Sequence, residues 1–256
     1  MVRVVDHLTA TDDSEMSVMS MLRGADVQSV LVGSSAPAGP EPDRLAGPFA
    51  HVVVDEAQEL TDAEWQMLLL RCPSRSFTIV GDRAQARHGF TESWQERLER
   101  IGLDRITLAS LSINYRTPAD VMAEAEPVIR AALPDANVPT SIRSSGIPVM
   151  HGPASDLGSI LDAWLAAHAE GIACVIDDHA SQAGRVRATS RVRSLTPELS
   201  KGLEFDLVVL IDPEEFGTGI EGAVDRYVAM TRATQQLVIL TSSYPNGKSG
   251  ENTSRS

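Results

Sequence analysis

Short apolar runs alternate along the chain with amphipathic segments, which is the pattern of an α/β protein built on parallel strands. Strands are expected at the apolar or alternating runs 27–32, 52–54, 76–80, 106–113, 147–150, 172–176, 185–193, 205–211 and 237–241. Helices are expected at the amphipathic segments 12–23, 62–71, 92–101, 118–127, 156–170 and 225–231. The fold class predicted from this alternation is α/β.

Local signals place the start of two of these helices. Thr61 and Glu64 have the spacing of a capping box, in which the hydroxyl covers one backbone N–H and the carboxylate reaches back to another. Thr117 is a good N-cap and Pro118 a good first helical residue, so a helix is expected to begin there. Pro127 is expected to kink or end that helix, because proline has no N–H to donate.

The 256 residues are enough for one large domain or two small ones. We place the boundary between two expected lobes near 109–114, which gives a first lobe at 1–110 and a second at 111–243. The segment 36–42 is a loop by its proline and glycine content. Residues 244–256 are rich in Ser, Gly and Asn and are expected to form a disordered tail.

Composition limits the classes of function. The formal net charge of −13 argues against strong non-specific binding to nucleic acid, which depends on Lys and Arg neutralising phosphates. It does not exclude a local basic groove. The two cysteines match no metal spacing, and the chain has no long apolar run for a membrane span and no apolar signal at its start. A reduced, cytoplasmic protein is expected.

Candidate chemistry begins where the strand 52–54 runs into Asp55 and Glu56. The apolar run predicts a buried parallel strand, and ligands bind at the carboxyl ends of such strands. One acid there can hold Mg²⁺ on a nucleotide phosphate, and its neighbour can orient or deprotonate a water. The alternative is a strand followed by an acidic helix N-terminus, where carboxylates favour the helix dipole.

Five polar motifs stand at strand ends or open the last helix. In order they are Asp55-Glu56-Ala57-Gln58, Gly81-Asp82-Arg83-Ala84-Gln85, Asn114-Tyr115-Arg116, Lys201-Gly202-Leu203-Glu204-Phe205 and Tyr227-Val228-Ala229-Met230-Thr231-Arg232-Ala233. In this order and spacing they resemble the motor core of UvrD/Rep-type superfamily 1 helicases, over about residues 50–241. Each motif alone is modest, whereas five in register are specific. The resemblance implies two RecA-like parallel-sheet lobes that bind ATP and Mg²⁺.

The same resemblance implies a role for each matching residue. Asp55 resembles the Mg²⁺ carboxylate and Glu56 the base that activates water. The remaining implied contacts are the γ-phosphate sensors Gln58 and Gln85, the arginines Arg116 and Arg232 that reach the γ-phosphate, the adenine-stacking Tyr115, the ribose contact Glu204, and Gly202 beside it. Taken singly, Tyr115 could be a core residue and Arg232 could neutralise a nearby acid.

The chain departs from that family at three places. It has no glycine-rich phosphate loop, because its only Gly-Lys-Ser, at 247–249, lies in the polar tail. Glu198 stands where the family usually has His, and Thr91-Glu92 stands where it usually has Arg-Gly, on a stretch that partly contacts single-stranded DNA. We therefore expect a first lobe truncated at its N-terminus, a motor whose N-terminal half is missing, and weak binding to DNA.

Three stretches narrow the resemblance further: 55–60, 71–76 and 114–118. They resemble the HelD/HelR-type proteins of actinobacteria, in which the helicase core is an ATPase that remodels or recycles RNA polymerase. The leading hypothesis is thus an RNA polymerase recycling motor, present as its C-terminal part. The alternatives are a UvrD-like DNA helicase fragment and a catalytically inactive truncated product that binds a partner or has no activity.

Overall fold

The computed structural model describes residues 2–6, 47–87, 90–178 and 189–243, with only the backbone described at 2–6. The elements expected at 12–23 and 27–32, the loop 36–42 and the tail 244–256 lie outside the described residues. The chain divides into two compact units, Met1–Arg116 with Asn137–Pro139 and Thr117–Ala136 with Thr140–Ser256. No helix of the described residues is both long and apolar enough to cross a membrane.

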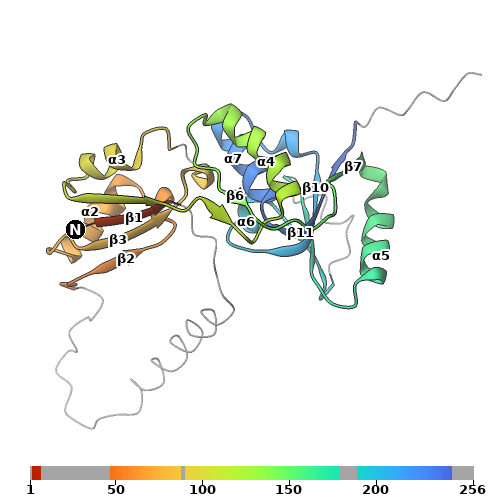
Figure 1. The fold of residues 1–256 in the computed structure, drawn as a ribbon, viewed down its shortest axis with the longest axis horizontal. Coiled ribbons are helices and arrows are strands. Elements are labelled where there is room, and N and C mark those ends of the chain that lie inside the picture. The colour runs from red at the N-terminus through yellow and green to blue at the C-terminus, as the bar shows by residue number, and fades with distance from the viewer. Residues whose placement is uncertain (1, 7–46, 88–89, 179–188, 244–256) are drawn as a thin grey trace, which may run out of the picture. The chain divides into compact units, whose positions relative to one another are not determined.

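The first unit contains a four-stranded sheet in the order β2-β3-β1-β4 (Figure 1). Its strands are β1 (Val2–Asp6), β2 (Val52–Val54), β3 (Phe77–Gly81) and β4 (Ile106–Ser110). Every pairing is parallel, as the sequence predicted. β1 was not predicted, and it lies between β3 and β4, with Asp6 paired with Gly81 on one side and with Ser110 on the other.

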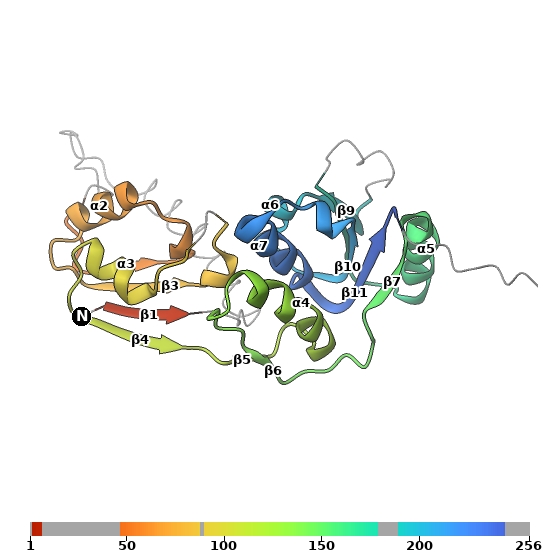
Figure 2. The same cartoon turned by 90° about the horizontal axis from the view of Figure 1, so that it is seen from above.

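Two helices cover one face of this sheet (Figure 2), α2 (Asp62–Arg71) and α3 (Trp94–Arg100). Trp65 of α2 and Leu98 of α3 share one buried cluster with Phe77 and Ile79, which alternate along β3 and so point to the same face. The predicted capping box is confirmed, since Glu64 Oε2 accepts from the Thr61 N–H at 2.8 Å and Thr61 Oγ1 from the Glu64 N–H at 3.3 Å.

β2 corrects one prediction. It was expected to be buried on both faces, yet Val53 is 67% exposed whereas Val54 is 7% exposed. The physical reason is its place at the edge of the sheet, where among the described residues only the helix-covered face is packed. The three consecutive β-branched residues therefore predicted a strand correctly, but the prediction that this strand is buried was wrong.

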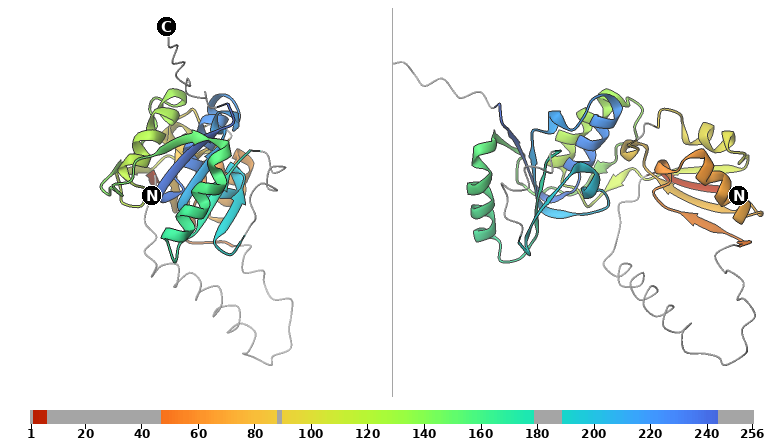
Figure 3. Two further views of the ribbon diagram at one scale, coloured as in Figure 1. Left: turned by 90° about the vertical axis from the view of Figure 1, so that its right-hand side faces the viewer. Right: turned by 180° about the vertical axis from the view of Figure 1, so that it is seen from behind.

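The second unit contains a five-stranded parallel sheet in the order β7-β11-β10-β8-β9. Its strands are β7 (Met150–Pro153), β8 (Ala173–Ile176), β9 (Val192–Leu195), β10 (Phe205–Ile211) and β11 (Ala233–Thr241). Its longer helices are α4 (Ala119–Ala132), α5 (Leu157–Ala167) and α7 (Gly219–Met230). Figures 2 and 3 show α4 and α7 on one side of this sheet and α5 on the other.

The remaining elements are short. They are β5 (Ile113–Asn114), β6 (Thr140–Ser141), α6 (Pro197–Ser200) and the 3₁₀ turns η1 (Ala57–Glu59), η2 (Arg83–Gln85), η3 (Ala154–Asp156) and η5 (Pro213–Glu215). β9 is shorter than the strand predicted over 185–193, of which residues 185–188 lie outside the described residues, and it is an edge strand. The two parallel sheets establish the predicted α/β fold class.

α4 decides part of one prediction and corrects another. Pro127 was expected to kink or end the helix, and it lies inside the helix and does not end it. The buried face of α4, formed by Val121, Met122, Ala125 and Ile129, outweighs the single backbone hydrogen bond that proline cannot make. Thr117 does not cap the helix, because its side chain is fully buried and its Oγ1 lies 3.5 Å from the Thr231 carbonyl oxygen.

Candidate functional site

The carboxyl ends of β2 and β3 bring two acidic turns to one edge of the first sheet. Asp55 and Glu56 follow β2, and Asp82 and Gln85 follow β3. The two strands pair in parallel, so both turns leave the sheet on the same edge. Ligands of open α/β sheets bind outside this edge, which makes these turns the candidate site.

The turn after β2 has an uncommon backbone. Glu56 has φ 52° and ψ 36°, in the left-handed region that residues other than glycine seldom occupy. Its N–H donates to Asp55 Oδ1 at 2.8 Å, and η1 begins directly after it. Such a conformation costs about 1–3 kcal/mol and is concentrated at functional sites. Asp55 and Glu56 both remain exposed at the end of the strand.

Gln58 joins the two turns. Its side chain is buried, and its Nε2 donates to Glu56 Oε2 at 2.5 Å. Its Oε1 accepts from the backbone N–H of Asp82 at 3.1 Å. Both ends of the carboxamide are thereby used, one on the acid after β2 and one on the turn after β3.

Asp82 organises the second turn. Its side chain is 6% exposed, and its two oxygens accept from the Ala84 N–H at 2.8 Å and from Gln85 Nε2 at 2.7 Å. Asp82 was not among the predicted site residues. The available signal was the Gly-Asp pair at the end of an apolar strand, which repeats the strand-then-acid pattern of Asp55.

Gly81 makes room for this arrangement. A Cβ at Gly81 would lie 2.6 Å from Trp94 Cζ2 and 2.8 Å from Gln58 Oε1. Both neighbours are buried, so neither can move away without disturbing the core. Glycine is therefore required here by the close approach of the Gln58 carboxamide and the Trp94 ring.

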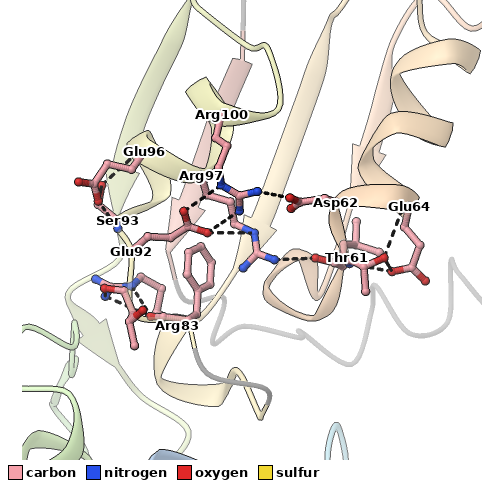
Figure 4. A network of polar contacts seen from close by, with 12 residues as sticks. Thr61, Asp62, Glu64, Arg83, Glu92, Ser93, Glu96, Arg97 and Arg100 are labelled. Atoms are coloured by element: carbon pink, nitrogen blue, oxygen red, sulfur yellow. Dashed lines mark hydrogen bonds and ion pairs between the residues drawn. The ribbon is translucent and has the colours of Figure 1, made fainter.

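Three arginines, Arg83, Arg97 and Arg100, lie close to the second turn (Figure 4). Arg83 is 8% exposed, and its Nη2 donates to the carbonyl oxygens of Phe90 and Thr91 at 3.2 and 3.3 Å. The guanidinium of Arg97 stacks over the Phe90 ring at 4.4 Å from its centroid, and the Phe90 ring meets Trp94 edge-on. The chain after Gln85 is thus held to α3.

α3 also contacts the segment after the first turn. Arg97 Nη2 donates to the Leu60 carbonyl at 2.8 Å, and Arg100 hydrogen-bonds Asp62 and Glu92 (Figure 4). These bonds, the one to Glu92 first, raise the pKa of Arg100 above its ordinary value. The Glu92 carboxylate, expected to oppose nucleic-acid phosphate, is paired with Arg100 at 2.8 Å and lies 3.8 Å from Arg97 Nε.

The acids do not form a preformed metal cage. Among the described residues, no group of three or more His, Cys, Asp or Glu side chains is placed to hold a metal ion. Mg²⁺ is usually bound by one or two carboxylates together with substrate phosphates. The exposed Asp55 carboxylate, with Glu56 beside it, fits that kind of shared site.

Tyr115 and Arg116 lie in the first unit, whereas the lobe boundary predicted from the sequence placed them in the second lobe. Tyr115 is 47% exposed, so it is not the core residue of the alternative interpretation. Asn114 is buried, and its Oδ1 accepts from the Arg116 N–H at 2.9 Å, which fixes the turn that presents both residues. The Arg116 side chain is partly buried.

The predicted residues of the second unit surround the start of β10 and the end of α7. Arg232 is 2% exposed; its Nε donates to the Val228 carbonyl at 3.0 Å and its Nη1 to that of Leu203 at 3.5 Å. Glu204 is exposed, and Gly202 has φ 73° with no atom within 4 Å of a Cβ built on it. In this structure Arg232 ties the end of α7 to the turn before β10.

The structure therefore brings Glu56, Gln58 and Gln85 into one hydrogen-bonded group with Asp82, next to Asp55. We refer to these five residues as the strand-end cluster.

No protein-family model and no curated protein matches the chain. Among solved structures, it is similar to the Arterivirus nonstructural protein 10 helicase with DNA, at 18% identity over 93% of this chain and 53% of that one, with a TM-score of 0.45. It is similar to the PRRSV helicase at 17% identity over 95% of this chain and 47% of that one, with a TM-score of 0.46. It is similar to the C-terminal domain of a possible DNA helicase from Lactobacillus plantarum at 15% identity over 50% of this chain and 86% of that one, with a TM-score of 0.37. The chain spans about half the length of the two viral helicases, and at these identities and TM-scores the likeness does not establish a family.

Proposed function

We propose that the chain is part of an ATP-driven helicase-type motor whose catalytic acids are those of the strand-end cluster. The observation that carries this proposal is the hydrogen-bonded arrangement of Glu56, Gln58, Asp82 and Gln85 beside the exposed Asp55. Phosphoryl transfer is catalysed mostly by positioning and charge stabilisation, and polar side chains held by hydrogen bonds at the carboxyl edge of a parallel sheet can supply both.

In this proposal each residue has a distinct task. Asp55 binds the Mg²⁺ that accompanies the nucleotide, directly or through water. Glu56 accepts a proton from the attacking water, with its carboxylate held by Gln58. Gln85, held by Asp82, lies at the second turn as the contact to the γ-phosphate region. Bound Mg²⁺·ATP supplies the phosphoryl group and a cation that neutralises charge on it.

The other residues in the proposal come from the sequence resemblance. Arg116 and Arg232 supply positive charge to the γ-phosphate, Tyr115 stacks on the adenine, and Glu204 with Gly202 contacts the ribose. Arg232 requires a change of conformation for this, since its guanidinium now binds the carbonyls of Val228 and Leu203.

A nuclear magnetic resonance titration of the chain tests the proposal, because it detects binding even in the millimolar range. Adding Mg²⁺·ATP is expected to shift the backbone amides of residues 55–58 and 82–85, and adding ATP with a chelator is expected to shift them much less. Asp55→Asn should remove that dependence on Mg²⁺. Shifts confined to other parts of the chain at millimolar Mg²⁺·ATP would refute the proposed site.

For the partner of the motor, we propose RNA polymerase, with DNA as a weak ligand. The support is the resemblance of 55–60, 71–76 and 114–118 to the polymerase-recycling branch, together with the net charge of −13. Gel filtration of the chain with purified bacterial core RNA polymerase, and separately with single-stranded DNA, tests this. Co-elution with DNA alone would favour the UvrD-like alternative, and co-elution with neither would favour an inactive product.

A further inference from the structure

We propose that Gln58 is a positioning residue that holds Glu56, and that it does not contact the nucleotide. The role given to Glu56 rests on the proposed function, whereas the hydrogen bonds of Gln58 do not. In this role Gln58 does not make the γ-phosphate contact that the sequence resemblance implied for it.

The orientation of the Gln58 carboxamide follows from the chemistry of its neighbours. The backbone N–H of Asp82 can only donate, so the Gln58 atom 3.1 Å from it is the oxygen. The amide nitrogen then faces Glu56 Oε2, 2.5 Å away, and a carboxylate oxygen accepts from it. Reversing the amide would oppose two donors on one side and two acceptors on the other.

Burial makes this arrangement difficult to exchange for a contact with a ligand. Gln58 is 5% exposed, and it lies against the Gly81 backbone, where Trp94 leaves no space for even one methyl group. Turning the side chain toward a nucleotide would leave the N–H of Asp82, itself 6% exposed, without its acceptor. It would also release Glu56, whose left-handed backbone already requires support from its surroundings.

Two substitutions separate the two hydrogen bonds of Gln58. Gln58→Leu keeps the approximate volume and removes both bonds. Gln58→Glu keeps an acceptor for the Asp82 N–H but places a carboxylate against that of Glu56, so the second bond alone is lost at a pH where both carboxylates are ionised. Gln95→Leu is the matched control, because Gln95 also donates to a glutamate, Glu99, at 2.7 Å but on the exposed surface of α3.

Amide hydrogen exchange, followed residue by residue on the full chain, tests the inference. Gln58→Leu is expected to speed exchange at the Asp82 amide by about tenfold or more, as for a buried N–H that loses its acceptor. Gln58→Glu should leave that amide protected and shift the Glu56 and Ala57 resonances, and Gln95→Leu should change neither. Unaltered exchange at Asp82 in Gln58→Leu would overturn the inference.

The Mg²⁺·ATP titration distinguishes positioning from contact. A positioning residue leaves the dissociation constant of Gln58→Leu within about twofold of the wild type, because ground-state binding does not use it. If Gln58 instead donates directly to the nucleotide, Gln58→Leu would weaken binding by about tenfold, and that result would overturn the inference. If the wild-type chain shows no binding at this edge, the proposed function fails, and the exchange experiment alone decides whether Gln58 holds Glu56.

Discussion

Gly81→Ala perturbs the candidate site without removing any of its polar groups. The substitution adds one methyl group at the end of β3. That carbon would lie 2.6 and 2.8 Å from two ring atoms of Trp94, and 2.8 Å from Gln58 Oε1. Real Cβ atoms do not approach other heavy atoms so closely, so the Trp94 ring, the Gln58 carboxamide or the strand must move.

The size of the effect follows from how little these neighbours can move. Trp94 and Gln58 are 4% and 5% exposed, and Trp94 packs edge-on against Phe90 with ring centroids 4.6 Å apart. Overpacking a close-packed site of this kind costs about 1–3 kcal/mol. If the Gln58 carboxamide is the group displaced, the Asp82 N–H also loses its acceptor, which costs about 1–3 kcal/mol more.

The assay is hydrogen exchange of individual amides under native conditions, because the two units need not unfold together. Gly81→Ala is expected to lower the opening free energy of β3 amides by about 1–3 kcal/mol. It should also remove much of the protection at Asp82.

The control is Gly158→Ala in α5, where a Cβ would meet no atom within 4 Å. Gly158 lies in the first turn of α5, so alanine there should stabilise α5 by at most about 0.5 kcal/mol, the lower end of the value for a helix interior. Wild-type protection of β3 and Asp82 in Gly81→Ala would show that Gln58 and Trp94 do not lie as described.

Further predictions concern helix capping, titration, hydrolysis and thiol reactivity. Thr61→Ala should destabilise α2 by about 1 kcal/mol through loss of its N-cap, measured by thermal unfolding. Hydrogen bonds from the backbone and hydroxyl of Thr61 lower the pKa of Glu64. The stabilisation by its carboxylate is therefore present above pH 4.5 and is lost as pH falls through the lowered pKa. Glu64→Ala should lower the free energy of unfolding less in acid than at neutral pH. Phosphate release from ATP by this chain alone should be negligible, because no phosphate loop holds the triphosphate in line with a water at Glu56; a turnover near that of a complete motor, abolished by Glu56→Gln, would contradict this. Burial raises the pKa of the Cys174 thiol to about 12, so a thiol reagent at pH 8 should label it only on unfolding, and fast labelling of the native chain would contradict its burial.

Binding to single-stranded DNA should also be weak at physiological salt, because the net charge is −13 and the arginines of α3 are engaged by Glu92, Asp62 and the Phe90 ring. Fluorescence anisotropy measures it, and a sub-micromolar dissociation constant would contradict the expectation. The contribution of Glu92 to this weak DNA binding differs from the one expected. Glu92 pairs with Arg97 and Arg100 and so keeps these arginines from phosphate, instead of repelling phosphate as an unpaired anion.

Local chemistry was predictable from the sequence wherever the interacting groups are close together along the chain. The capping box of Thr61 and Glu64 needs only residues three apart on one helical turn, and α2 begins at Asp62, where this box placed its start. β10 (Phe205–Ile211) has the predicted bounds because six of its seven residues are apolar, and all but Asp206 are buried. The polar motifs at strand ends were found in the same way.

Predictions failed where a distant contact decides the outcome. Thr117 has the chemistry of an N-cap, yet its hydroxyl is directed toward Thr231, which is 114 residues away along the chain. β2 has the sequence of a buried strand, but its place at the sheet edge exposes Val53.

The sequence by itself determined the alternation of strands and helices, the parallel α/β class and the position of Asp55 and Glu56 at a strand end, because periodicity and turn chemistry act over a few residues. Only the tertiary structure decided that Gln58 reaches from the first turn to the backbone of Asp82, 24 residues further on. Only it decided that Gly81 must lack a side chain for that bond to form. The physical reason is that pairing β2 with β3 in parallel sets two distant turns side by side, and the partners that a buried carboxamide requires are then supplied by packing and not by neighbours in the chain.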